Sequence, residues 1–411
     1  MSKPSVISLF SGAGGLDYGF EAAGFQTTVA VEMNHACCET LRANRAWPVI
    51  ERDIFDVPSA ELLQTAGLKR GEADLLIGGP PCQPFSKSGY WARGDAQRLD
   101  DPRSNTLGAY LRVLEETKPR AFLLENVEGL AYRGKDEGLQ LLLQAIDGIN
   151  QRTKSKYRVT FQVLNAVDYG VPQLRKRLIM IGSRDGQAFD FPEPGRSPHQ
   201  LELFGAESFR RTAWDAIGDV ELSPDDDVEL TGRWADLVPS IPEGKNYLWH
   251  TSRGGGQELF GWRRHFWSFL LKLAKDQPSW TIQAQPGPAS GPFHWDNRRL
   301  SMRELCRLQT FPDDVSIAGT RISMQKQIGN AVPSLLAEVL GRAVRTQLLD
   351  LKQVRGSLKL LPPQREPVPP ATRPKSVPKK FRDRIGEHSA HPGTGQGHGA
   401  IQRGALASLS T

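Results

Sequence analysis

Short apolar runs alternate with longer amphipathic stretches over about the first 185 residues of the chain. Each run is rich in aliphatic residues and is bounded by glycine, proline or polar residues, which is typical of buried parallel strands. The predicted strands are 6–10, 27–31, 75–77, 121–124, 162–164 and 178–182. A helix-like stretch near 16–23 follows the first strand, and another near 104–116 precedes the fourth. This alternation predicts an α/β fold with a doubly wound, mostly parallel sheet and helices on both faces.

The pattern loses its regularity after about residue 190 and regains it near residue 301. Residues 191–295 are rich in Pro and Gly and hold seven of the nine tryptophans, so we expect a second, irregular domain there. Ser301 and Glu304 have the spacing of a capping box, and 333–349 is predicted to be the last amphipathic helix. Beyond about residue 361, Pro, Lys, Arg and Gly predominate and large apolar residues are few, which predicts a disordered tail.

The composition is that of an ordinary soluble protein, with 39% hydrophobic and 24% charged residues in 411. No apolar stretch approaches the roughly 20 residues that span a bilayer, and the first residues lack the pattern of a signal peptide. Cys37 and Cys38 are adjacent, and the four cysteines show no C-x-x-C spacing. We therefore expect free thiols in a reducing cytoplasm, no metal and no membrane partner.

The net charge of +6 is concentrated at one end of the chain. Residues 352–411 hold 11 Lys and Arg against 3 Asp and Glu, a net +8, which leaves the preceding 351 residues at −2. A nucleic-acid-binding surface on the body must therefore be a local patch, and the tail is a candidate for salt-sensitive contact with phosphates. A solvated tail without such a role is the alternative.

Cys82 is the most distinctive candidate for chemistry, since it lies in the run GGPPCQPFS at 78–86, directly after a predicted strand. Open α/β sheets place ligands at the carboxyl ends of their strands, and flanking prolines restrict the backbone around the thiol. A thiolate held in this way suits nucleophilic attack at a fixed angle. The alternative is a small buried thiol in a structural loop, but core packing does not require this string of residues.

A glycine loop, FSGAGG at 10–15, follows the first strand and opens a helix. Glycines let the backbone turn tightly and approach a ligand closely. Glu32 ends the second strand 17 residues after Gly15, where an acidic residue usually accepts from the ribose hydroxyls of an adenosine-containing cofactor. The loop lacks the Gly-Lys-Ser/Thr ending of a phosphate-binding loop and departs from G-x-G-x-x-G, which counts against NAD.

Two further polar positions lie in predicted turns. Asp53 and Ile54 are placed to bind an adenine amino group and pack against its ring, although Asp53 also suits a plain turn. Asn330 lies just before Pro333, which fits the first turn of the last helix. Its amide suits hydrogen bonding to a ligand, and an ordinary helix start is the alternative.

Polar side chains also follow or precede the later strands. Glu125 ends the fourth predicted strand, so its carboxylate is expected at the same sheet edge as Cys82, unless it has a capping or structural role. Strand alternation would point Gln173, Arg175 and Arg177 to one face. Such forked polar groups suit a phosphate or a base carbonyl, and a solvated basic strand is the alternative.

Taken in order, these segments resemble the DNA (cytosine-5)-methyltransferase family, in its bacterial, restriction-modification-like form. The resemblance covers roughly residues 5–345 and is broken only by the irregular Trp-rich region. The segments that carry it are FSGAGG at 10–15, VE at 31–32, DI at 53–54, GPPCQPFS at 79–86, ENV at 125–127, QLRKR at 173–177, RELCRLQTFP at 303–312 and QIGNAVP at 327–333. Glu51 and Arg52 depart from the small residue that relatives commonly carry before the Asp.

The resemblance implies a Rossmann-like methyltransferase sheet that binds S-adenosylmethionine and a smaller, irregular target-recognition domain. The implied divisions are a catalytic and cofactor-binding domain at 1–189, a target-recognition domain at 190–300, a return segment at 301–350 and a basic, disordered tail at 351–411. The implied cofactor-binding residues are Phe10, Gly12, Gly14, Gly15, Glu32, Met33, Asp53, Ile54, Pro80, Asn330 and Val332.

The implied catalytic residues are Cys82, Glu125, Arg175 and Arg177. By resemblance, Cys82 adds to C6 of cytosine, Glu125 binds N3 and the exocyclic amine, Arg177 holds O2 and Arg175 orients the backbone. The base must be flipped out of the duplex to be reached. The implied partners are double-stranded DNA and a cognate restriction endonuclease, with the enzyme acting as a monomer and without a metal.

Three other functions compete with this one. The tRNA-methylating relatives carry a Cys-Phe-Thr signature in the recognition region, whereas this chain has no cysteine between Cys82 and Cys306. A DNA-binding regulator without catalysis would not need Cys82, Glu125 and Arg177 together. A nicotinamide-dependent oxidoreductase would share the sheet but not the cysteine loop. The recognised sequence stays open, and Arg263, Arg264, Arg298 and Arg299 are candidates for phosphate or guanine contacts.

Overall fold

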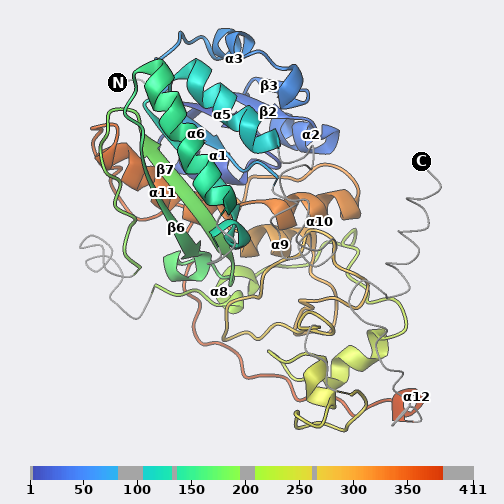
Figure 1. The fold of residues 1–411 in the computed structure, drawn as a ribbon. Helices are drawn as coiled ribbons and strands as arrows, with labels where there is room; N and C mark the ends of the chain where they lie inside the picture. The colour runs from blue at the N-terminus through green and yellow to red at the C-terminus, as the bar shows by residue number, and fades with distance from the viewer. Residues whose placement is uncertain (1–2, 82–104, 132–136, 195–208, 262–265, 383–411) are drawn as a thin grey trace, which may run out of the picture.

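A seven-stranded sheet forms the centre of the larger part of the molecule (Figure 1). The computed structural model describes residues 3–81, 105–131, 137–194, 209–261 and 266–382. The strands are β1 (Ser5–Leu9), β2 (Gln26–Glu32), β3 (Val49–Glu51), β4 (Leu75–Gly78), β5 (Ala121–Val127), β6 (Arg158–Asn165) and β7 (Lys176–Ser183). Their order is β3-β2-β1-β4-β5-β7-β6, and only β7 runs antiparallel to its neighbours. The predicted doubly wound sheet is confirmed, and the half-buried, three-residue β3 is the strand that the sequence pattern did not predict.

The strand order reverses between β1 and β4. From β1 the chain continues to β2 and β3 on one side, whereas β4 leads to β5 on the other. The carboxyl ends of β1 and β4 flank this point of reversal, and sheets of this kind bind their ligands in a crevice at such a point. The glycine loop and the start of the cysteine loop both emerge at this point.

Helices cover both faces of the sheet (Figure 1). The described helices are α1 (Gly15–Ala22), α2 (His35–Asn44), α3 (Ser59–Ala66), α5 (Asn105–Thr117), α6 (Glu137–Thr153), α8 (Ala213–Ile217), α9 (Met302–Leu308), α10 (Arg321–Asn330), α11 (Ser334–Gln347) and α12 (Lys379–Arg382). Apolar residues of α1 and α11 pack on one face of the sheet, and those of α3, α5 and α6 pack on the other. No helix in this described part of the chain has the length and apolar character needed to cross a membrane.

The contact between α1 and α11 is unusually close, although their sequences lie more than 300 residues apart. A Cβ atom at Gly19 would lie 2.2 Å from the carbonyl oxygen of Ser334, so no larger residue fits without moving a helix. The segment after residue 300 thus returns to the sheet and forms part of its core. Its first helix, α9, begins with the predicted capping box between Ser301 and Glu304.

The small region, which we define as residues 209–300, has little regular structure. Besides α8 it contains the 3₁₀ helices η7 (Ala235–Ser240) and η8 (Tyr247–His250) and isolated bridges. Its core is built from scattered large side chains such as Tyr247, Leu270 and Phe293. This agrees with the irregular texture that the sequence predicts.

Residues 351–382 differ from the disordered tail that composition predicts. Leu358, Leu360 and Leu361 pack against the core beside α11, and Val377 and Phe381 are buried in the core of the small region. The segment has few large apolar residues, but these pack against cores formed by the rest of the chain. A prediction from the average composition of the segment does not detect such contacts. Residues 383–411 lie outside the described part of the chain.

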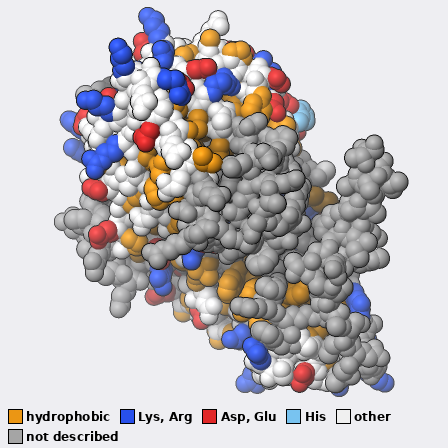
Figure 2. Space-filling model, in the orientation of Figure 1, with side chains coloured by type: hydrophobic (Ala, Val, Ile, Leu, Met, Phe, Trp, Pro, Cys, Tyr) orange, Lys and Arg blue, Asp and Glu red, His pale blue; other side chains and the backbone are white. Residues whose placement is uncertain are grey.

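Lys and Arg side chains are interspersed with Asp and Glu over the upper, sheet-containing part of the face in Figure 2. This distribution agrees with the near-neutral charge of the body.

Candidate active site

The chain leaves β4 through two glycines that its neighbours require. A Cβ atom at Gly78 would lie 2.9 Å from the carbonyl oxygen of Leu9, and one at Gly79 would lie 2.7 Å from Oε2 of Glu125. The carbonyl of Pro80 accepts a hydrogen bond from Nδ2 of Asn126 at 3.2 Å. The cysteine loop therefore starts against the end of β5, in contact with Glu125. Cys82 itself lies outside the described residues.

Glu125 and Arg177 form an ion pair at the carboxyl end of β5. The antiparallel pairing of β5 with β7 brings them together, and Nε of Arg177 lies 2.7 Å from Oε1 of Glu125. Burial raises the pKa of Glu125, while Arg177 and Arg175 oppose that rise. Burial is the larger effect, so the pKa of the Glu125 carboxyl lies above its usual value, and a carboxyl with a raised pKa is suited to general acid catalysis.

Arg175 has a different environment from the one predicted. Its side chain is buried, and its two terminal nitrogens donate to the carbonyl oxygens of Ile282 at 3.3 Å and Gly329 at 2.7 Å. Desolvation lowers its pKa well below the usual value, and the charge of Arg177 adds to this. Arg175 thus ties the sheet to the small region and to α10.

Gln173 has a similar structural role. It is fully buried, its Nε2 donates to Oε1 of Gln309 at 3.1 Å, and its Oε1 accepts from the backbone N–H of Ile282 at 3.1 Å. The solvated-strand alternative is therefore wrong for Gln173 and Arg175. The guanidinium of Arg177 is the member of this set that lies beside Glu125.

The glycine loop is tied to the end of β2 by a carboxylate. Oε2 of Glu32 accepts from the backbone N–H of Gly12 at 2.8 Å, and Oε1 accepts from that of Asn34 at 2.8 Å. The loop has positive φ angles at Phe10, Gly12 and Gly14, at 53°, 55° and 83°. A Cβ atom at Gly12 would meet no described atom within 4 Å, so this part of the loop borders open space.

Gly15 is closely packed against the return segment. A Cβ atom there would lie 2.4 Å from the carbonyl oxygen of Val332, so the return segment lies directly against the start of α1. Val332 is itself buried in the core, whereas Asn330, the last residue of α10, is exposed. Met33 is 67% exposed at the end of β2.

Asp53 caps the 3₁₀ helix η1 (Ile54–Asp56), since its carboxylate accepts from the backbone N–H of Phe55 at 3.1 Å. The turn role considered for Asp53 is therefore present. Ile54 is 3% exposed and belongs to the core that contains α5 and α6.

Asp17 is a residue near the glycine loop that sequence reasoning missed. It lies in the first turn of α1, is fully buried, and accepts from Oγ of Ser8 and Oγ1 of Thr27, both at 3.1 Å. Ser8 also contacts Oγ of Ser11, within the loop, at 2.8 Å. Burial raises the pKa of Asp17 to about 6. The signal in the sequence was an acidic residue on an otherwise apolar helix face.

The arginines proposed to contact DNA have other partners. Arg298 binds both carboxylate oxygens of Glu304 at 2.7 and 2.8 Å, and Arg299 binds Asp227 at 2.8 Å. Both therefore stabilise the small region and its junction with α9. Arg263 and Arg264 lie outside the described residues.

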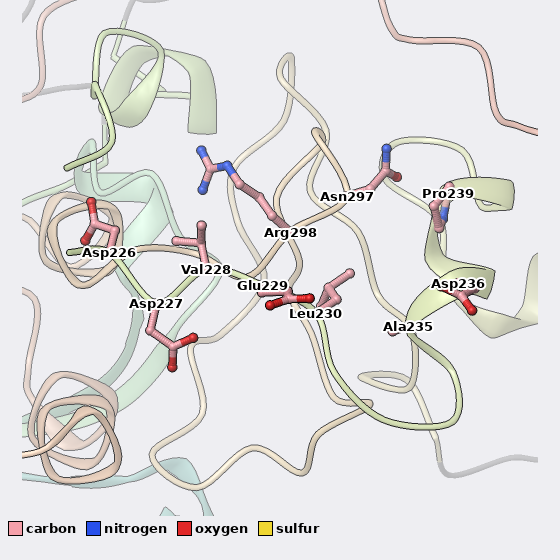
Figure 3. A pocket seen from close by; sticks show the side chains of 10 residues that line it. All are labelled: Asp226, Asp227, Val228, Glu229, Leu230, Ala235, Asp236, Pro239, Asn297 and Arg298. Atoms are coloured by element: carbon pink, nitrogen blue, oxygen red, sulfur yellow. The ribbon is translucent and has the colours of Figure 1, made fainter. Parts of the chain in front are cut away.

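A hollow of about 570 Å³ is lined by residues of the small region alone (Figure 3). Four acidic side chains, Asp226, Asp227, Glu229 and Asp236, contribute to its lining. Their charge disfavours a DNA phosphate, and two of them already pair with cations, since Asp227 binds Arg299 and Asp236 binds Lys380. This hollow is therefore not a candidate active site.

Residues 5–346 match the family model described as C-5 cytosine-specific DNA methylase. The chain belongs to this family. It is a DNA (cytosine-5)-methyltransferase, as the resemblance in the sequence predicts. The crevice beside Glu125 and Arg177 is accordingly the candidate active site.

Two relatives are similar over most of the chain. One is the Type II methyltransferase M.SacI of Streptomyces achromogenes, 41% identical, with 84% of this chain and 93% of the relative covered. Another is the Type II methyltransferase M1.HphI of Haemophilus parahaemolyticus, 33% identical, with 83% and 86% covered. The structure of Entamoeba histolytica methyltransferase EhMeth is similar in fold, with a TM-score of 0.58 at 15% identity, covering 85% of this chain and 99% of that one.

Proposed function

We propose that this methyltransferase moves the methyl group of S-adenosylmethionine to C5 of a cytosine that is flipped out of duplex DNA, through a covalent adduct between Cys82 and C6. The observation that carries the proposal is the ion pair of the buried Glu125 with Arg177, in which Glu125 lies beside Gly79, three residues before Cys82. The role of Cys82 rests on its place in the family's Pro-Cys motif.

The residues of the glycine loop fit S-adenosylmethionine. Gly12 borders open space at the carboxyl end of β1, and its N–H is held by Glu32. The Glu32 carboxylate accepts two backbone hydrogen bonds and has further lone pairs with which to accept from ribose hydroxyls. When bound, S-adenosylmethionine supplies an electrophilic methyl group on a sulfonium. Asn330, exposed at the end of α10, is proposed as a further contact.

The protein's own groups would activate the base. C5 of cytosine is a poor nucleophile, and addition of the Cys82 thiolate to C6 converts the ring into an enamine that is nucleophilic at C5. Glu125, whose pKa is raised by burial, would donate a proton to N3 during this addition. Arg177, already aligned by Glu125, would hold O2 of the base. After methylation, loss of the C5 proton to a base, elimination of the thiolate and return of the N3 proton to Glu125 would restore the aromatic ring, Cys82 and Glu125.

The reaction requires the cytosine outside the stack, because neither face of C6 can be reached within a duplex. The relatives named above are Type II methyltransferases, and we propose the same role here, with a cognate restriction endonuclease that cuts the same unmethylated sequence. We further propose that the enzyme acts as a monomer, since one chain carries the whole set of motifs.

The test is transfer of a labelled methyl group from S-adenosylmethionine to unmethylated genomic DNA. After digestion to nucleosides, the label is expected in 5-methyldeoxycytidine, and sequencing of the methylated DNA would identify the recognised site. Glu125→Gln should lower the rate by at least about a hundredfold, since general acid catalysis contributes that much. Label in N4-methyldeoxycytidine or N6-methyldeoxyadenosine, or no transfer at all, would contradict the proposal.

A further inference from the structure

Residues 357–382, which we call the strap, run from α11 across α8 to the far end of the small region (Figure 1). The strap follows the last residue matched by the family model, residue 346. It forms only four residues of helix, α12, at its end. Its contacts nevertheless attach it to three separate places on the molecule.

The first attachment is to α11. Glu338 is fully buried, and its two carboxylate oxygens accept from the backbone N–H groups of Lys359 at 2.8 Å and Leu360 at 2.9 Å. Arg342 pairs with the same carboxylate at 2.7 Å. Charge-assisted hydrogen bonds to a buried carboxylate are among the stronger ones in proteins, so the strap is fixed where it leaves the sheet.

The second attachment is at α8. The backbone N–H of Arg365 donates to Oδ1 of Asp215 at 2.8 Å, and its guanidinium pairs with Asp219 at 2.6 Å. Nε of Arg211 donates to the carbonyl of Pro362 at 2.7 Å. Helix α8 packs in turn on α9, so this attachment lies at the junction of the small region with the return segment.

The third attachment completes the core of the small region. The N–H of Lys375 donates to the carbonyl of Pro239 at 2.8 Å. Phe381 is 3% exposed and stacks on Trp234, with ring centroids 5.7 Å apart and an angle of 15° between the planes. Val377 is buried in the same cluster. The end of the strap is therefore an integral part of the small region.

The other contacts between the two parts of the molecule lie around Ile282, whose backbone binds Gln173 and Arg175, and where α8 packs on α9. The core around Trp234 and Phe381, by contrast, is formed by described residues of the small region and the strap alone. Contacts on one side of the small region leave it free to rock about them, whereas the strap also holds this other core and restrains the rotation. We propose that the strap holds the small region in register with the crevice, and that Phe381 is a positioning residue for DNA.

The experiment measures steady-state methyl transfer and S-adenosylmethionine binding for the full chain and for Phe381→Ala. We expect the KM for duplex DNA to rise about tenfold, which corresponds to about 1.4 kcal/mol of lost orientation, while kcat and cofactor affinity stay within about twofold. Phe381→Leu, which keeps most of the apolar volume, should return KM towards the wild-type value. Ser376→Ala, an exposed neighbour in the strap, is the control and should change nothing.

This inference rests on the proposed function, but the two fail differently. A wild-type protein that transfers no methyl group to DNA contradicts the proposed function. An active wild type whose KM for DNA is unchanged by Phe381→Ala contradicts the strap's role. A drop in kcat and in bound cofactor for Phe381→Ala, at constant KM for DNA, also contradicts the strap's role. That result would mean that less of the variant protein is folded, and not that its small region is misoriented towards DNA.

Discussion

Replacement of Gly19 by alanine tests whether the return segment is part of the fold's core. The added Cβ atom would lie 2.2 Å from Ser334 O, 2.4 Å from Ala337 Cβ and 2.8 Å from Glu338 N. Two of these atoms belong to the backbone of α11, so no rotamer change can relieve the contact. Since ordinary contacts begin near 3.4 Å, the two helices must separate by about 1 Å.

The expected magnitude follows from two opposing effects. Overpacking in a close helix contact costs about 1–3 kcal/mol and at times more, while alanine gains about 1 kcal/mol over glycine in helix propensity. Because two of the clashing atoms belong to the backbone, we take the upper end of this cost, about 3 kcal/mol, and after the gain of about 1 kcal/mol we expect Gly19→Ala to lose about 2 kcal/mol of unfolding free energy. Gly108→Ala is the matched control, because Gly108 is an exposed glycine in α5 with open space around its Cβ position. It should gain about 1 kcal/mol from propensity alone.

The assay is urea unfolding of wild type and both variants, followed by circular dichroism, with the midpoints and slopes compared. The two variants should move the midpoint in opposite directions. Cofactor binding should weaken for Gly19→Ala alone, because α1 begins at the glycine loop. Equal stability of Gly19→Ala and Gly108→Ala would refute the close contact between α1 and α11.

Two further predictions concern charged residues in the interior. Arg298→Ala should destabilise the protein by about 3–5 kcal/mol, because it leaves the buried Glu304 without its bidentate partner. The salt dependence of DNA binding should stay unchanged. A weaker salt dependence of DNA binding with unchanged stability would instead indicate that Arg298 contacts a phosphate. Asp17 has a pKa raised from 3.8 to about 6, so its contribution to stability is fully present below about pH 4 and is lost as the pH rises through 6. Asn does not titrate, so only the wild type should lose this stability as the pH rises. The unfolding free energy of Asp17→Asn minus that of wild type should therefore increase by about 3 kcal/mol between pH 4 and pH 8. A difference that stays constant with pH would contradict this.

The sheet could be predicted because buried parallel strands appear as uninterrupted apolar runs. The same pattern located Glu125, since a carboxylate at the end of such a run must lie at the edge where ligands bind. The pattern did not reveal β3, which is three residues long and half-buried, nor that β7 would lie antiparallel to β5 and so place Arg177 beside Glu125.

The environments of Gln173 and Arg175 could not be predicted from their alternation. Alternation along a strand predicts which side chains share a face, but not which segment covers that face. Here residues 279–282, which lie more than 100 positions later in the sequence, cover the face that carries Gln173 and Arg175. Residues 351–382 show the same limit. Their composition favours disorder, whereas Phe381 and a few other apolar residues are fixed by cores formed elsewhere in the chain.

The most direct test of the proposed chemistry uses a duplex that carries the recognised sequence with 5-fluorocytosine at the target position. Fluorine at C5 cannot leave as a proton does, so the reaction should stop after methyl transfer with the base still bonded to the protein. Incubation with S-adenosylmethionine is expected to give a denaturant-resistant protein–DNA complex whose modified peptide contains Cys82, and Cys82→Ala should give none. An adduct at another residue, or full turnover of normal DNA by Cys82→Ala, would contradict the account.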